Sequence, residues 1–208
     1  MQAGLTDITF ILDRSGSMSR IKADTEGGFN TFLEEQKKVD GECTVNLYQF
    51  DNKYEVVYED TPLAAAPPLV LIPRGNTALL DAIGRTVEAR GARYTEMDED
   101  KRPEHVIFVI MTDGEENASQ EYTLDTIKSM LEHQQEVYGW TVIYLGANQD
   151  AIKVGGHLGI AKGSSMTYDA CSVGATYSVV SDSVLKVRSM GTSVSFSDSQ
   201  RDAANGKV

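Results

Sequence analysis

Both the fold and a candidate site are encoded in the segment Ile8-Thr9-Phe10-Ile11-Leu12-Asp13-Arg14-Ser15-Gly16-Ser17-Met18. Its first five residues form a nearly continuous apolar run, which is typical of a parallel strand covered on both faces. The run ends in a turn that offers one carboxylate, from Asp13, and two hydroxyls, from Ser15 and Ser17. Oxygen atoms at alternate positions of a turn can point at one centre, and they select a hard cation such as Mg²⁺, Mn²⁺ or Ca²⁺. The segment therefore predicts a central strand that ends in half of a metal site.

Taken alone, this turn has a second interpretation, because a Ser-Gly-Ser sequence can simply cap the helix that follows, with Asp13 as a favourable N-terminal charge. The rest of the chain favours the metal site. Two further oxygen sources follow where a second and a third loop would supply them. They are Thr77, within Arg74-Gly75-Asn76-Thr77-Ala78-Leu79, and Asp113, within Met111-Thr112-Asp113-Gly114-Glu115. For Thr77, too, a helix cap is the alternative role.

Composition narrows the class of protein. The chain has 208 residues, 41% of them hydrophobic, which is enough to bury one sizeable core. With 31 acidic and 19 basic residues, the net charge is −12, and we expect no nucleic-acid partner because no basic stripe is visible. We also expect a cytoplasmic protein without membrane contact, since residues 1–7 do not resemble a signal peptide and no apolar run has membrane-spanning length. Cys43 and Cys171 form no Cys-x-x-Cys pair, so neither a disulfide framework nor a zinc ribbon is expected.

Strand and helix patterns alternate along the chain. Residues 43–50 and 54–60 predict a hairpin whose second strand is an antiparallel edge, because only three residues separate them. Gly27-Gly28 lies inside a predicted helix at a cost of about 1 kcal/mol each, and close packing against the sheet is the expected reason. The other predicted strands are 8–12, 105–111, 140–145 and 166–169; the predicted helices are 18–38, 77–90, 123–138, 150–158 and 173–191.

This order predicts an α/β fold, a doubly wound, Rossmann-like and mostly parallel sheet with one antiparallel edge strand and helices on both faces. We assign residues 1–191 to the domain and 192–208 to a polar C-terminal tail that is loose by composition. In such sheets, ligands bind at the carboxyl ends of the strands where the strand order reverses. Asp13 and Asp113 end two strands that we expect to be neighbours at that point.

The set Asp13, Ser15, Ser17, Thr77 and Asp113 resembles the metal-ion-dependent adhesion site of the von Willebrand factor type A family. The resemblance covers about residues 5–190, including the Asp-x-Ser-Gly-Ser-Met form of the first loop and the Thr-Asp-Gly of the third. It implies that Ser15 and Ser17 ligate the ion directly and that Thr77 does so in the ligand-bound state. It further implies that Asp13 and Asp113 act directly or through water.

The resemblance also implies a function. An ion held mainly by neutral hydroxyls stays electrophilic, so its open position favours a carboxylate from an Asp or Glu of a partner protein. Stand-alone bacterial and phage domains of this family look like intracellular scaffolds or assembly factors that often work with ATP-dependent remodelling proteins of the AAA type. We expect Arg14 to face solvent, and Glu115 and Glu116 to begin a solvated loop.

Two other functions remain open at this point. The first is a Mg²⁺-dependent hydrolase or phosphotransferase, because Asp13 follows a strand as a nucleophile would. Against it, the second position after Asp13 is Ser15 rather than another carboxylate, and no Lys or His is tied to the site. The second is a purely structural subunit without metal. The five intact ligand positions favour a non-catalytic, metal-dependent binding module over both.

Overall fold

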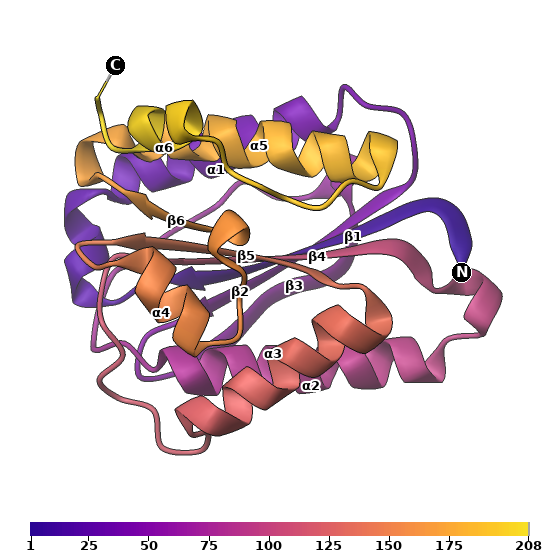
Figure 1. Cartoon of the computed structure of the whole chain (residues 1–208), viewed down its shortest axis with the longest axis horizontal. Coiled ribbons are helices and arrows are strands. Elements are labelled where there is room, and N and C mark those ends of the chain that lie inside the picture. The colour runs from indigo at the N-terminus through magenta and orange to yellow at the C-terminus, as the bar shows by residue number, and fades with distance from the viewer. Residues whose placement is uncertain (208) are drawn as a thin grey trace.

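The structure of the protein is a computed structural model that describes residues 1–207. Six strands form one sheet in the order β3-β2-β1-β4-β5-β6, in which only the β2–β3 pair is antiparallel (Figure 1). This confirms the predicted mostly parallel sheet with one antiparallel edge strand. The strands are β1 (Gln2–Asp13), β2 (Cys43–Phe50), β3 (Tyr54–Pro62), β4 (Pro103–Thr112), β5 (Thr141–Ala147) and β6 (Ser165–Tyr168).

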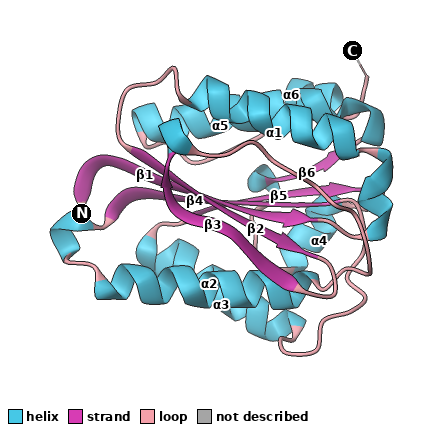
Figure 2. Ribbon diagram, turned by 180° about the vertical axis from the view of Figure 1, so that it is seen from behind, coloured by secondary structure: helices cyan, strands magenta, loops and turns pink. Residues whose placement is uncertain are grey.

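Helices cover both faces of the sheet, as Figures 1 and 2 show, with α1, α5 and α6 on one side and α2 and α3 on the other. The helices are α1 (Lys22–Gln36), α2 (Leu79–Glu96), α3 (Leu124–Tyr138), α4 (Ala151–His157), α5 (Val173–Met190) and α6 (Asp198–Ala204). Short 3₁₀ turns are η1 (Gly16–Arg20), η2 (Leu63–Ala65), η3 (Glu99–Lys101), η4 (Lys162–Ser164) and η5 (Ala170–Ser172). None of the helices among residues 1–207 is both long and apolar enough to cross a membrane.

The first strand explains why both faces need cover. Phe10 packs toward α1, with its ring edge-on to Phe29 at 4.9 Å between centroids, whereas Ile11 belongs to the cluster under α2 and α3. Successive side chains of a strand point to opposite faces, so a continuous apolar run is buried only between two layers of helices. The prediction of a central strand from the nearly unbroken apolar run that begins at Ile8 is therefore confirmed.

The topology brings two site residues to one edge of the sheet. β1 and β4 are parallel neighbours, with Leu12 opposite Met111, so Asp13 and Asp113 leave the sheet side by side. From β1 the chain continues to β2 on one side, and it later returns to β4 on the other. The order thus reverses between β1 and β4, which is the point where parallel α/β sheets open a crevice.

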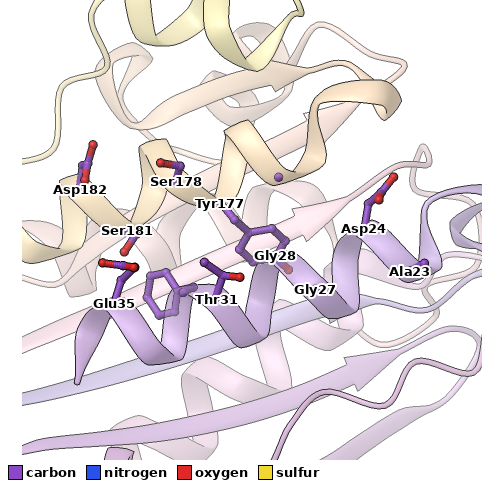
Figure 3. A pocket seen from close by; sticks show the side chains of 12 residues that line it. Ala23, Asp24, Gly27, Gly28, Thr31, Glu35, Tyr177, Ser178, Ser181 and Asp182 are labelled. Carbon is purple, nitrogen blue, oxygen red and sulfur yellow. The ribbon is translucent and has the colours of Figure 1, made fainter. Parts of the chain in front are cut away.

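The glycine pair in α1 has a different explanation from the predicted one. Gly28 packs against α5 rather than against the sheet, and a Cβ built there would lie 2.3 Å from Cδ2 of Tyr177. Figure 3 shows the Tyr177 ring beside Gly28, in a groove between α1 and α5. Gly27 has open space around its Cα, since a Cβ there would meet no atom within 4 Å. The packing argument therefore applies to one glycine of the pair, and to a helix–helix contact.

The C-terminal segment is ordered, which makes the prediction of a loose tail wrong for residues 192–207; Val208 lies outside the described residues. Phe196 is 5% exposed, and it joins the core cluster on the α1 and α5 side together with Val194 and Ala204. Ser197 and Gln200 form a capping box that starts α6, and the amide of Asp169 donates to the carbonyl of Ala204 at 2.9 Å. A few buried side chains hold this segment in place. The polar average composition of the segment gives no sign of them.

Candidate metal centre

Asp13 closes β1 with a fully buried carboxylate that is fixed at both oxygens. Its Oδ1 accepts the amide of Ser15 at 2.6 Å, and its Oδ2 accepts the hydroxyl of Thr112 at 2.6 Å. Thr112 is the last residue of β4, so this bond joins the ends of the two central strands. The carboxylate is therefore held in one orientation at the switch point of the sheet.

The two serines and the second aspartate form a connected chain of oxygen atoms. The hydroxyls of Ser15 and Ser17 lie 3.0 Å apart, and that of Ser17 donates to Oδ1 of Asp113 at 2.5 Å. Met18, in the same turn, is fully buried and anchors it to the core. The turn thus presents its polar side chains on one side and its apolar anchor on the other.

Thr77 brings the second loop to the same place. A Cβ built on Gly114 would lie 3.1 Å from Oγ1 of Thr77, 3.6 Å from Oγ of Ser17 and 3.9 Å from Oδ2 of Asp13. Oxygen atoms of the first and second loops therefore lie around one point beside Gly114 of the third loop, and the absence of a side chain at Gly114 leaves that point open. Within residues 1–207 the Thr77 hydroxyl makes no hydrogen bond, so its lone pairs are free toward that point. All five predicted site residues come together here.

The alternative role of Thr77, a helix cap, does not hold in the structure. α2 begins at Leu79, and none of its N-terminal amides is capped by Thr77. The loop after β4 supplies the cap, because Oε2 of Glu116 accepts the amide of Leu80 at 3.0 Å and the Ser119 hydroxyl accepts that of Asp81 at 3.1 Å. This arrangement leaves the Thr77 hydroxyl available, and it contradicts the expectation that Glu116 begins a solvated loop.

Burial makes this site attractive to a cation. It raises the pKa of Asp13 to about 6, against the lowering effect of hydrogen bonds from Thr112 and Ser15. It also raises the pKa of Asp113, although Ser17 and the charge of Arg20 act in the opposite direction. Neither carboxylate takes part in an ion pair among the described residues, so little positive charge offsets the free-energy cost of burying them. A bound cation would supply that charge.

The donor set fits a hard divalent ion. It consists of two carboxylates and three hydroxyls, all oxygen, which is the chemistry that Mg²⁺, Mn²⁺ and Ca²⁺ prefer. No group of three or more His, Cys, Asp and Glu side chains suited to a metal occurs in the described part of the chain. The candidate centre is compatible with that finding because hydroxyls make up most of its ligands.

Comparison with known proteins identifies the fold. No family model matches the sequence, and no curated protein matches it significantly. Among solved structures, proximal thread matrix protein 1 from the mussel byssus, with a zinc-occupied MIDAS motif, superposes with a TM-score of 0.62 at 16% identity, over 89% of this chain and 46% of its own. The fold is that of a von Willebrand factor type A domain.

Two bacterial proteins give the same result for the type A fold. The pilus adhesin SpaC from Lactobacillus rhamnosus GG has a TM-score of 0.62 at 15% identity over 87% of this chain, and a von Willebrand factor type A structure from Catenulispora acidiphila has 0.57 at 13% over 86%. This chain covers 30% and 42% of those two chains. It therefore spans less than half the length of each of the three proteins, and at these identities the likeness concerns the fold alone.

Within this type A fold, Arg14 does not face solvent as predicted. Its side chain is 5% exposed, its Nε donates to Oδ2 of Asp51 at 3.0 Å, and its guanidinium also pairs with Glu55. The amide of Arg14 bonds the carbonyl of Phe50, which continues the β1–β2 pairing past the end of β1. This extra pairing turns the side chain over the β2–β3 hairpin and away from the candidate ion.

Two further residues of the site region, Asn148 and Gln149, were not predicted from the sequence. The side-chain amide of Asn148 donates to the carbonyl of Asp113 at 3.2 Å, and that of Gln149 donates to the carbonyl of Gly114 at 3.2 Å. Asn148 has a φ of +56°, a left-handed conformation that Asn tolerates better than most residues. Their position just after β5 was an available signal, because the same rule located Asp113 after β4.

Proposed function

We propose that this type A domain is a non-catalytic protein-binding module that depends on a divalent metal ion. Asp13, Ser15, Ser17, Thr77 and Asp113 would hold Mg²⁺ or Mn²⁺, with Ca²⁺ as the alternative ion. An Asp or Glu carboxylate of a partner protein would complete the coordination. The observation that carries the proposal is the convergence of three loops on the open point at Gly114, where the Thr77 hydroxyl makes no hydrogen bond with residues 1–207.

The chemistry of the ligands explains why a partner would be needed. Three of the five are neutral hydroxyls, which donate little charge to a dication and leave it a strong electrophile. An anionic oxygen from outside is then the preferred extra ligand. We extend the proposal to an intracellular scaffold or assembly role, with an AAA-type ATPase as a candidate partner, on the strength of the sequence resemblance.

The arrangement gives less support to a hydrolase or phosphotransferase. A nucleophile needs an adjacent base, and general acid–base chemistry needs a group within hydrogen-bond reach of the reacting atom. His105 lies in β4, His133 in α3 and His157 in α4. None of the three forms a hydrogen bond with a site residue within residues 1–207. The three loops offer ligands for an ion, but they offer no activated nucleophile.

Two measurements on purified protein test the proposal. Calorimetric titration should detect Mg²⁺ or Mn²⁺ binding, and a pull-down should recover a partner only in the absence of chelator. We expect no metal-dependent turnover of nucleotides or phosphoesters. Hydrolysis that is lost in Asp13→Asn would instead establish the enzymatic alternative, and equal partner recovery with and without chelator would remove the metal from the mechanism.

A further inference from the structure

One buried side chain of the turn between β2 and β3 joins two loops of the candidate site, the Asp13–Ser17 turn and the segment from Arg74 to Thr77. Asp51 is 2% exposed. Its Oδ2 accepts Nε of Arg14 at 3.0 Å and Nε of Arg74 at 2.8 Å, while its Oδ1 accepts the amide of Lys53 at 2.6 Å. Arg14 lies between the ligands of the first loop, and Arg74 begins the segment that leads to Thr77. Asp51 thus bridges two loops that are separated by about 60 residues of sequence.

Backbone bonds add to this bridge. The amide of Ala78, next to Thr77, donates to the carbonyl of Asp51 at 3.0 Å. The amide of Arg74 donates to the carbonyl of Arg14 at 2.8 Å, and that of Gly16 to the carbonyl of Gly75 at 3.1 Å. The Thr77 segment is therefore attached at one end to the Asp13–Ser17 turn, through Arg74 and Gly75, and at the other end to the backbone of Asp51, through Ala78.

The ion pairs of Asp51 with Arg14 and Arg74 do not take part in binding a ligand of the ion. The Arg14 guanidinium is buried and occupied by carboxylates, so it is not free to receive a ligand. Because removal of one partner of a buried ion pair leaves a charge unpaired, Arg14 depends on Asp51 to keep its place. The Thr77 hydroxyl makes no hydrogen bond among the described residues, so the attachments of its segment determine where it lies. Besides those to Asp51 and the Asp13–Ser17 turn, the Thr77 amide donates to Oδ1 of Asn117 and its carbonyl accepts the Asn117 amide, both at 3.0 Å.

We propose that Asp51 is a positioning residue that sets how far the Thr77 hydroxyl stands from the Asp13–Ser17 turn. Acting through Arg14 and Arg74, it keeps the carboxylate-binding position of the ion complete while touching neither the ion nor the partner. This inference rests on the proposed function. It adds that an ion pair outside the coordination shell controls how the bound ion responds to a carboxylate.

Mn²⁺ alone and Mn²⁺ with acetate are suitable probes, because free Mn²⁺ is measured directly by its electron paramagnetic resonance signal. If a carboxylate binds the ion at the site, excess acetate should tighten Mn²⁺ binding roughly fivefold relative to chloride at equal ionic strength, since coupling between two ligands is reciprocal. Asp51→Asn and Arg74→Gln should leave Mn²⁺ affinity in chloride within roughly twofold and reduce the acetate effect. Thr77→Ala should abolish that effect.

A double variant separates positioning from general damage. If Asp51 acts through Thr77, adding Asp51→Asn to Thr77→Ala should change nothing further. Arg93→Gln is the matched control, because its Nε bonds Oδ2 of Asp60 at 2.8 Å with side chains 43% and 42% exposed, away from the three loops. The Arg74 side chain is 53% exposed, so Arg74→Gln remains informative even if Asp51→Asn fails to fold.

The outcomes distinguish this inference from the proposed function. A wild-type protein that binds no Mn²⁺ overturns both. Wild-type binding with an acetate effect that Thr77→Ala abolishes, but that Asp51→Asn and Arg74→Gln leave intact, overturns only the positioning role. An additional loss in the double variant would show that Asp51 acts by another route and would also overturn it.

Discussion

At the scale of single residues, the five candidate ligands differ in what they would contribute to an ion. Asp13 brings charge and is held at both oxygens, by Ser15 and Thr112, so its geometry is set before any ion binds. Thr77 brings a neutral hydroxyl without an internal partner, so nothing in the described structure competes for it. Because of these differences, substitutions can separate what each candidate ligand contributes to metal affinity from what it contributes to partner binding.

Three substitutions make that separation. Asp13→Ala should lose both metal and partner, because removing a carboxylate weakens the field that holds a dication. Thr77→Ala should keep the fold and much of the metal affinity while losing partner capture, and Ser15→Ala should lie between them. Calorimetric titration and a metal-dependent pull-down measure the two properties. Equal partner binding by the wild type and Thr77→Ala would refute the role given to Thr77.

At the scale of elements, α1 offers a matched pair of glycines. Gly28→Ala would place a Cβ 2.3 Å from the Tyr177 ring, so strain of about 1–3 kcal/mol should outweigh the gain in helix propensity. Gly27→Ala meets no atom within 4 Å, and it should stabilise the protein by up to about 1 kcal/mol. Urea midpoints at constant m-value measure both changes. A stabilised Gly28→Ala would show that α1 and α5 separate more easily than this packing implies.

The cap of α2 makes a second prediction about an element. Glu116 accepts the amides of Leu80, Ala118 and Ser119 at 2.8–3.0 Å, so Glu116→Ala should destabilise the protein by about 1–2 kcal/mol. Glu115→Ala is the control, because Glu115 is exposed and its side chain makes no hydrogen bond within residues 1–207, and it should stay within about 0.5 kcal/mol of wild type. Equal denaturation midpoints for the two variants would contradict the capping role.

These elements show which features a sequence can reveal. The apolar run before Asp13 and the polar residues that end β1 and β4 obey local rules, so the sheet and the meeting of the five site residues were predictable. The cap by Glu116, the ion pair of Arg14 with Asp51 and the contact of Gly28 with Tyr177 each join residues far apart in the chain. Without knowledge of that packing, the sequence predicts that Arg14 faces solvent and that Glu116 begins a solvated loop.

The C-terminal segment failed prediction for a related reason. Its composition is polar, and an average composition does not distinguish the few buried residues from the exposed ones. Val194, Phe196 and Ala204 are buried, and the Arg201 guanidinium donates to the carbonyls of Ser165 and Lys162 at 2.7 and 2.8 Å. These contacts cover the sheet at β6, an edge strand whose short length of four residues would otherwise leave it weakly held.

At the scale of the whole molecule, the apolar core is built without the candidate metal ligands. Two apolar clusters lie on opposite faces of the sheet, and they are made of strand and helix side chains. The five candidate ligands lie at the carboxyl edge of the strands, outside both clusters. Folding should therefore precede metal binding, in contrast to small zinc domains in which the metal supplies most of the folding free energy.

Removal of metal tests this division between core and site. At an ion concentration about 100 times its dissociation constant, binding adds roughly 2.7 kcal/mol to the free energy of unfolding. For a domain of this size each kcal/mol corresponds to roughly 2–4 °C, so chelator should lower the melting temperature by roughly 5–10 °C and leave the circular dichroism of the folded state unchanged. Asp13→Asn should melt at the same temperature with and without chelator, because it has no bound ion to lose. Complete unfolding of the wild type in chelator at room temperature would make the metal a structural element and would reject the separation of core and site.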